Sequence, residues 1–192
     1  MRTLYIKLIL FLSLSICISA YGQENRPDRK LHIPKSKDEI HLLDSTINLY
    51  KAGDFYISGQ PNDSIIATLK DQDIGLIINV RTPEEMEIIK ESGFDEEAFS
   101  DSLNISYVNI PIGGSYGFNQ TSIKAINDAI ISHDGAVLIH CRSAGRATNA
   151  WMAWLINYYD VPINDAISLG RHMQLRLYLE DLLGYELSFS KE

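Results

Sequence analysis

One cysteine lies among residues that could make it a nucleophile. The segment 136–148 reads Ala-Val-Leu-Ile-His-Cys-Arg-Ser-Ala-Gly-Arg-Ala-Thr, so Cys141 is followed within five positions by Arg142 and Arg146. Nearby positive charge favours the thiolate, which is the nucleophilic form of cysteine. An arginine fork can hold two oxygens of a tetrahedral oxyanion at once, which a lysine cannot. The segment therefore predicts a nucleophile, Cys141, beside an oxyanion-binding residue, Arg146.

The sequence around Cys141 is typical of a strand, a short loop and a helix. Residues 136–139 form an apolar run with β-branched side chains, which predicts a buried strand. After the loop, apolar residues recur at helical spacing; they are Ala147, Ala150, Trp151, Trp154, Leu155 and Tyr158. The first N–H groups of a helix have no partner within it, so a loop entering a helix suits an anion. We expect the two tryptophans to lie in the core behind this loop.

The rest of the chain is predicted to alternate strands with helices. Strands are expected at 55–58, 75–80 and 105–110, and helices after Asp63 or Ser64, from Thr82 to Gly93, over 94–103, over 121–132 and within 163–183. A short helix or packed lead-in is expected at 38–50, and a flexible loop at 113–117. This alternation predicts an α/β fold with a mostly parallel central sheet flanked by helices. Ligands bind at the carboxyl ends of such strands, where Cys141, Arg81 and the 113–117 loop would meet.

The amino terminus is typical of a secretory signal peptide. Arg2 and Lys7 precede an apolar run over 8–18, and small residues follow at 19–22. The run is shorter than the roughly 20 residues of a membrane span, so we expect no stable span after cleavage and a secreted or periplasmic protein. The predicted organisation is a signal peptide over 1–22, a flexible linker over 23–37 and one folded domain over 38–192.

Charge and cysteine content limit the partners and cofactors. The formal net charge is −8, and losing the signal peptide removes two positive charges and no negative one, which gives −10. This balance argues against nucleic acid and anionic membrane surfaces as partners. Cys17 would leave with the signal peptide, so Cys141 would be the one thiol of the mature chain and no internal disulfide could form. The five histidines show no ligand spacing, and we expect neither a metal nor a cofactor.

Three motifs together resemble a known family. They are Tyr56-Ile57-Ser58-Gly59-Gln60-Pro61, then Ile77-Ile78-Asn79-Val80-Arg81 with Glu84 or Glu85, then His140-Cys141-Arg142-Ser143-Ala144-Gly145-Arg146 followed by Trp151. In this order they resemble the beta-lactamase-hydrolase-like phosphatase domain, which belongs to the cysteine-dependent, dual-specificity-like protein tyrosine phosphatase superfamily. The resemblance covers residues 50–175, roughly, and implies a protein-tyrosine-phosphatase-like fold, so that 38–192 would be a phosphatase-like domain.

The resemblance also implies a two-step reaction on a phosphorylated small molecule or phosphoprotein. Cys141 would attack phosphorus, and water would then hydrolyse the phosphocysteine. Arg146 would hold the equatorial oxygens, and His140 would orient the loop. Further substrate-binding candidates are Arg142, Ser143, Ala144 and Gly145, whose amides would line the oxyanion cradle, and Arg81, which could instead pair with a carboxylate.

The chain departs from the family pattern at several positions. Four residues separate Cys141 from Arg146, where the superfamily has five, and Ala144 occupies the position of a family glycine. An alanine there is strained if its φ is positive. Ala147 replaces the hydroxyl residue expected after the arginine. The loop 112–120 contains no Asp or Glu to act as general acid, although candidates elsewhere are Asp54, Asp63, Glu84 and Glu85. Aryl phosphates, whose leaving groups need least protonation, would be affected least.

Two other functions are compatible with these residues. The four-residue spacing and the segment Leu76 to Glu85 also resemble the rhodanese sulfurtransferases, in which Cys141 would carry a persulfide and no general acid is needed. Alternatively, the domain could be a catalytically degenerate phosphatase fold that binds an anion without turnover. The acidic run Asp95-Glu96-Glu97 is expected to be a solvated face rather than part of a site.

Overall fold

The computed structural model describes residues 30–175 and 179–186, and the predicted signal peptide lies outside them. In these residues a six-stranded sheet has the order β1-β2-β3-β6-β4-β5. The strands are β1 (Ile40–Asp44), β2 (Leu49–Ala52), β3 (Phe55–Ser58), β4 (Ile74–Asn79), β5 (Ser106–Asn109) and β6 (Ala136–His140). The last four strands in the sheet order run parallel, while β1 and β2 add an antiparallel pair at one edge. The predicted α/β fold with a mostly parallel sheet is confirmed.

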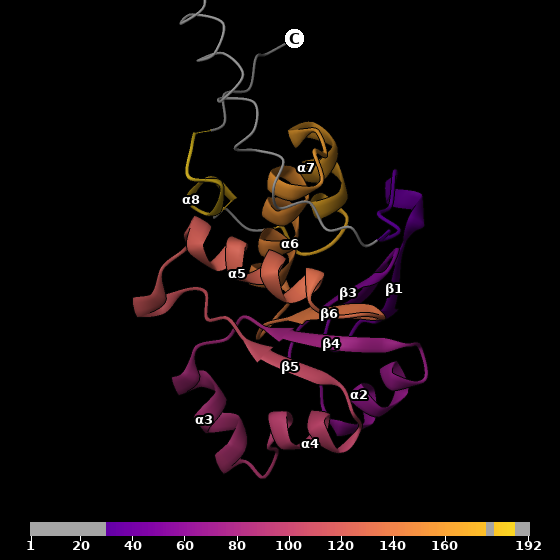
Figure 1. Ribbon diagram of the computed structural model, residues 1–192, viewed down its shortest axis with the longest axis vertical. Coiled ribbons are helices and arrows are strands. Elements are labelled where there is room, and N and C mark those ends of the chain that lie inside the picture. Colours follow the sequence, from indigo (N-terminus) through magenta and orange to yellow (C-terminus); the bar gives the residue numbers. More distant parts are fainter. Residues whose placement is uncertain (1–29, 176–178, 187–192) are drawn as a thin grey trace, which may run out of the picture.

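Helices cover both faces of the sheet. They are α2 (Asp63–Lys70), α3 (Pro83–Glu91), α4 (Glu96–Ser102), α5 (Gln120–Ile131), α6 (Gly145–Tyr158), α7 (Ile163–Arg171) and α8 (Leu179–Leu183), with short 3₁₀ turns η1 (Lys37–Glu39) and η2 (Gly114–Tyr116). Figure 1 shows α2, α3 and α4 on one side of the sheet and α5 to α8 on the other. Within the described residues, no helix has the length and apolar character to cross a membrane.

The central strand β6 is apolar because both of its faces are covered. Val137 and Ile139 pack into the larger hydrophobic cluster, on the α5 and α6 side, while Leu138 packs into the smaller cluster with α2 residues. Successive strand residues point to opposite faces, so one run of three apolar residues serves both clusters. Trp151 and Trp154 of α6 are fully buried in the larger cluster, as predicted.

Helix starts follow the capping residues of the sequence. Thr82 caps α3 in a capping box, in which its hydroxyl accepts from Glu85 N and the Glu85 carboxylate accepts from Thr82 N. For α2 the cap is Asn62, one residue before the predicted position, because its side chain accepts from Ile65 N. The predicted flexible loop at 113–117 contains the 3₁₀ turn η2.

The short helix predicted for 38–50 is wrong, whereas its alternative, a packed lead-in, holds for Ile40, Leu49 and Tyr50, which are buried. The chain forms β1 and β2 there, joined by a turn in which Asp44 Oδ1 accepts from Thr46 N at 2.7 Å and Asn48 has φ 53°. The apolar residues have helical spacing, but Leu43 is 51% exposed, so the spacing does not mark a buried face. Backbone pairing with the neighbouring strand decides the structure here.

Part of the predicted linker packs against the domain. Leu31 is buried, and its N–H donates to the Tyr159 hydroxyl at 3.3 Å. His32 N donates to Asp54 Oδ2 at 2.7 Å, and His32 O accepts from Asp54 N at 3.0 Å. Residues 31 and 32 therefore contact the folded domain, and residues 23–29 of the linker lie outside the described chain.

Candidate active site

The carboxyl ends of the four parallel strands form one row. Ser58 of β3 pairs with His140 of β6, His140 pairs with Asn79 of β4, and Asn79 pairs with Asn109 of β5. The loops that follow these four residues therefore leave the sheet at the same edge. This is the edge predicted from the sequence, and it is where ligands bind in parallel α/β folds.

The Cys141 loop connects β6 to α6 through a left-handed residue. Cys141 N donates to Ser58 O at 3.1 Å, which ties the start of the loop to β3. Ala144 is fully buried at the N-cap of α6, with φ 69° and ψ −24°. No side chain of the described residues caps this helix, so its first N–H groups remain available for an anion.

The thiol and Arg146 line one cavity of about 660 Å³. Its described lining residues come from α3, from the loop after β5 and from the Cys141 loop; they are Thr82, Glu85, Gly113, Gly114, Phe118, Cys141, Arg142, Ser143, Gly145 and Arg146. The glycine at 113 has φ 99°, and a Cβ built there would lie 3.5 Å from Cδ and Nη1 of Arg146. The positive φ favours glycine at this position, and a Cβ there would be in ordinary van der Waals contact with Arg146.

Glu85 holds Arg146 in a two-point ion pair. Arg146 Nη2 lies 2.7 Å from Glu85 Oε1, and Nη1 lies 2.8 Å from Oε2. A second hydrogen of Nη1 is donated to Ile112 O at 2.8 Å. Arginine has five N–H donors, so these contacts leave Nε–H and one Nη2–H for a ligand or for the sulfur. The guanidinium is fixed before any substrate arrives.

The ion pair changes the acid–base behaviour of both partners. Burial works against the charged form of Arg146, but the hydrogen bond to Glu85 and the nearby Cys141 outweigh it and raise the pKa of the guanidinium. Burial likewise tends to raise the pKa of Glu85, but the contact with Arg146 and the Thr82 amide lower that pKa overall. Glu85 therefore remains a carboxylate at neutral pH.

Arg81 lies behind this pair and is not among the described residues that line the cavity. It is 5% exposed, its Nε lies 3.6 Å from Glu85 Oε1, and its Nη1 donates to Gln60 Oε1 at 2.6 Å. Burial lowers the pKa of Arg81, with Arg146 acting in the same direction and Glu85 opposing it. Of the two roles considered for Arg81, the structure supports pairing with a carboxylate.

His140, the residue before Cys141, contacts a buried carboxylate. His140 Nε2 lies 2.8 Å from Glu96 Oε1, a close contact without a hydrogen bond, and both side chains are fully buried. Gln60 Nε2 donates to the other Glu96 oxygen at 2.9 Å. The expectation of a solvated face at 95–97 is therefore wrong for Glu96, because α4 turns this residue toward the end of β6.

The other candidate residues take distinct places around the loop. Arg142, Ser143 and Gly145 line the cavity, whereas Ala144 is buried at the start of α6. Of the four candidate acids, Glu85 lies in the cavity. Among the described residues that line the cavity, Glu85 is the one with a carboxylate. The loop 112–120, which follows β5, contains no Asp or Glu.

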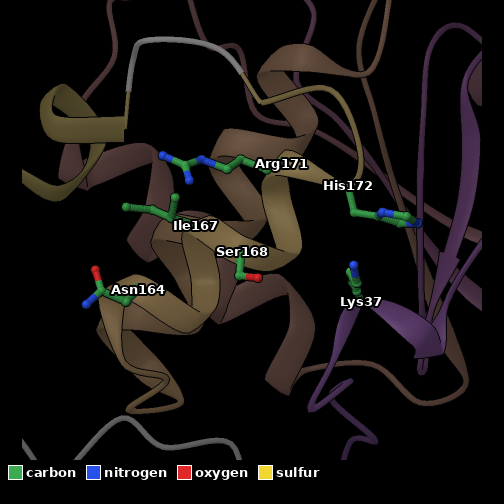
Figure 2. A pocket seen from close by; sticks show the side chains of 6 residues that line it. All are labelled: Lys37, Asn164, Ile167, Ser168, Arg171 and His172. Atoms are coloured by element: carbon green, nitrogen blue, oxygen red, sulfur yellow. The ribbon is translucent and has the colours of Figure 1, made fainter.

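A second hollow, of about 450 Å³, lies along α7. Its lining residues are Lys37, Asn164, Ile167, Ser168, Arg171 and His172. In Figure 2 the side chains of Arg171 and Ile167 point away from those of Lys37 and His172. The basic groups do not converge on one point, and the described lining contains no nucleophilic thiol or carboxylate. We therefore assign the chemistry to the Cys141 cavity.

The described residues contain no cluster of three or more His, Cys, Asp or Glu side chains that could hold a metal ion.

Sequence comparison finds two similar curated proteins. No family model matches the chain. It is 32% identical over 91 residues to "Beta-lactamase hydrolase-like protein" of Xylella fastidiosa, in two strains. The match covers 47% of this chain and 21% of the relative, so the chain spans about a fifth of the length of the curated relatives that it matches. The resemblance predicted from the three motifs is confirmed at this level.

Solved structures share the fold at low sequence identity. Pseudomonas aeruginosa TpbA matches with a TM-score of 0.55 and 17% identity, over 69% of this chain and 78% of that one. A cysteine-to-serine variant of TpbA in complex with pTyr matches with a TM-score of 0.54 and 17% identity, over 69% and 77%. Kinase associated phosphatase, with its catalytic-site cysteine replaced by serine, matches with a TM-score of 0.55 and 16% identity, over 83% and 99%. The chain has a protein-tyrosine-phosphatase-like fold and resembles the beta-lactamase hydrolase-like proteins.

Proposed function

We propose that this protein is a cysteine-dependent phosphatase that hydrolyses phosphomonoesters through a phosphocysteine. The observation that carries the proposal is that Cys141 and a pre-positioned Arg146 line one cavity at the amino end of α6. The fold, shared with kinase associated phosphatase, supports it.

The geometry suits transfer of a phosphoryl group in two steps. Cys141 Sγ attacks phosphorus, an S–P bond forms, and the P–O bond breaks, so that the leaving oxygen departs as an anion and takes its proton from solvent. Water then attacks the phosphocysteine, the S–P bond breaks, and inorganic phosphate leaves with the thiolate restored. Throughout, the loop N–H groups and the two remaining N–H donors of Arg146 hold the non-bridging oxygens.

The favoured substrate class is aryl phosphates. The carboxylate in the described lining is Glu85, and its lowered pKa keeps it ionised and paired to Arg146, so it is a poor proton donor. Leaving groups that are stable as anions then react best, because general acid catalysis contributes about 10²–10⁴-fold to reactions that need it. The pTyr complex of TpbA supports phosphotyrosine as an example of this class.

A series of phosphate esters with the wild type and Cys141→Ser tests the proposal. We expect the wild type to release phosphate from p-nitrophenyl phosphate and phosphotyrosine peptides, with kcat/KM falling steeply as the pKa of the leaving group rises. Cys141→Ser should be inactive, while Ser102→Ala, on an exposed residue of α4, should match the wild type. Equal rates on aryl and alkyl phosphates would contradict the absence of a general acid, and activity in Cys141→Ser would contradict the nucleophile.

The same proteins distinguish the remaining candidate functions. The four-residue spacing between Cys141 and Arg146 favours a sulfurtransferase as second candidate, and thiocyanate formed from thiosulfate and cyanide would support it. An anion-binding protein without turnover would give neither product. We also propose that the protein acts outside the cytoplasm, since residues 1–22 have the composition of a signal peptide.

A further inference from the structure

A single amide side chain joins two charged groups that flank the Cys141 loop. Gln60 lies two residues after the end of β3, next to Gly59. Its Oε1 accepts from Arg81 Nη1 at 2.6 Å, and its Nε2 donates to Glu96 Oε2 at 2.9 Å. In the chain, Arg81 lies 21 positions after Gln60, and Glu96 lies 36 positions after it.

Each charged partner leads to a residue next to the reacting atoms. Arg81 Nε lies 3.6 Å from Glu85 Oε1, and this same carboxylate oxygen binds Arg146 Nη2 at 2.7 Å. On the other side, Glu96 Oε1 lies 2.8 Å from His140 Nε2, one residue before the nucleophile. The amide is thus the link between the contacts that end on Arg146 and those that end on His140.

The chemistry of these contacts requires an amide at position 60. The Arg81 guanidinium offers only donors and the Glu96 carboxylate only acceptors, whereas an amide has an acceptor oxygen beside a donor nitrogen. Arg81 is 5% exposed and Glu96 2% exposed. Leaving such a buried charged group without its hydrogen bond is strongly unfavourable.

The backbone fixes this amide relative to the Cys141 loop. Gln60 N donates to Arg142 O at 3.3 Å, and Gly59 forms a bridge with Ser143. A Cβ built on Gly59 would lie 2.7 Å from Ile47 O and 3.0 Å from Arg142 O, so only glycine fits this close approach.

We infer that Gln60 is a positioning residue of the phosphatase reaction, an inference that rests on the proposed function. It is not among the described residues that line the cavity, so it acts through others. Through Arg81 and Glu85 it fixes the direction of the Arg146 guanidinium, and through Glu96 it fixes His140. Catalysis by orientation is sensitive to displacements of this kind.

Two single variants separate its two hydrogen bonds. Gln60→Met removes both and should lower kcat/KM for p-nitrophenyl phosphate by about 10- to 100-fold. Gln60→Glu keeps the acceptor for Arg81 but brings a carboxylate oxygen to the position 2.9 Å from Glu96 Oε2. The kcat/KM of Gln60→Glu should approach that of the wild type as pH is lowered, because a protonated carboxyl can donate a hydrogen bond to its neighbour. Gln60→Met should show no such recovery.

An exchange of the two side chains should restore activity. In the double variant Gln60→Glu with Glu96→Gln, the carboxylate accepts from Arg81 and from the new amide, whose oxygen faces His140. We expect kcat/KM within about threefold of the wild type, since the exchange restores the hydrogen bond to Arg81 and the one between positions 60 and 96. Gln72→Met and Gln72→Glu, on an exposed turn after α2, are the matched controls and should leave activity unchanged. Melting temperatures confirm that each variant is folded.

The outcomes separate this inference from the proposed function. If the wild type is active and the Gln60 variants equal it, or if the double variant is no better than Gln60→Glu, the inference is wrong. If the wild type lacks phosphatase activity, the proposed function is wrong, and the same variants are compared by their affinity for tungstate in isothermal titration. A weaker affinity in Gln60→Met supports the positioning role. An unchanged affinity, or a wild type that binds no tungstate, contradicts it.

Discussion

Arg146 combines two uses of one guanidinium. Glu85 takes the outer fork of Nη1 and Nη2 at 2.8 and 2.7 Å, and the remaining donors face the thiol side. An arginine whose direction is set in advance loses little conformational entropy when a phosphoryl group binds. Substrate recognition at this position therefore depends on a carboxylate that the substrate does not contact in the proposed reaction.

Replacing Ala144 should relieve backbone strain. A left-handed conformation is unfavourable by roughly 1–2 kcal/mol for an L-residue with a Cβ, and Ala144 has φ 69°. Glycine removes that strain but gains about 0.4–1 kcal/mol of freedom in the unfolded chain. We expect Ala144→Gly to raise the free energy of unfolding by about 0.5–1 kcal/mol in equilibrium urea denaturation.

The control for this prediction lies in a regular helix. Ala125→Gly, in the interior of α5, should lower the free energy of unfolding by about 1 kcal/mol, since glycine is a weak helix former. A destabilised Ala144→Gly would show that the alanine side chain contributes more through packing than the strained φ removes.

At the scale of elements, α3 and α6 are coupled through one side chain. Glu85 completes the capping box of α3 by accepting from Thr82 N at 3.0 Å, and it also binds Arg146 near the start of α6. The conformation of the site is therefore linked to the formation of the first turn of α3. The loop after β5 adds a third contact through Ile112 O.

This coupling predicts a specific dependence of stability on pH. Because the folded-state pKa of Glu85 is lowered, its contribution is present above the unfolded-state pKa of about 4.3 and is lost as pH falls through the folded-state value. Glu85→Gln should therefore destabilise the protein by about 1 kcal/mol at pH 7, and the difference from the wild type should shrink below about pH 4. Urea denaturation across this pH range measures it.

Glu87→Gln provides the comparison for this experiment. Glu87 is exposed on the same helix and outside the contacts with Thr82 and Arg146. Glu87→Gln should change the free energy of unfolding less than Glu85→Gln does above about pH 4. A Glu85→Gln effect that stays constant into acid would mean that the contribution of Glu85 is not one of charge.

The parts of the fold that depend on neighbouring residues could be predicted from the sequence. The strand, loop and helix around Cys141 were predictable because a β-branched run, an arginine-containing loop and helical apolar spacing are adjacent in the chain. The capping box of Thr82 and Glu85 was predictable for the same reason. The β1 and β2 pair was not, since Leu43 and its neighbours have helical spacing and only pairing across the hairpin decides the structure.

The position of Cys141 and Arg146 in one cavity was predictable from the sequence, but the contacts that hold Arg146 and His140 were not. Glu85 stood out as one of four carboxylates, yet its contact with Arg146 joins residues 61 positions apart. The contact between Glu96 and Gln60 spans 36 positions, and charge patterning alone assigned Glu96 to solvent. Long-range pairing of buried polar groups depends on the packing of α3 and α4 against the sheet, which no local pattern encodes.

At the scale of the whole molecule, the proposal that the protein acts outside the cytoplasm rests on residues 1–22. We expect the mature chain to begin at Tyr21 or Gln23, as cleavage after Ala20 or Gly22 predicts. Intact-mass analysis of periplasmic fractions from a bacterial host measures this. Leu10→Arg, which places a charge in the apolar run, should keep the protein in the cytoplasm with Met1 or Arg2 retained. A wild-type chain of full length in the cytoplasm would contradict the prediction.

The row Ser58, His140, Asn79 and Asn109 has a consequence for the timing of activity. β6 lies between β3 and β4, which precede it by about 60 to 80 residues in sequence, and such distant pairing forms slowly. A slip of one residue would move the thiol by about 3.3 Å and turn its neighbours to the opposite face. The position of the sulfur therefore depends on pairing between segments far apart in the chain, and a chain that had not yet formed this pairing would lack the cavity in which we propose that Cys141 reacts.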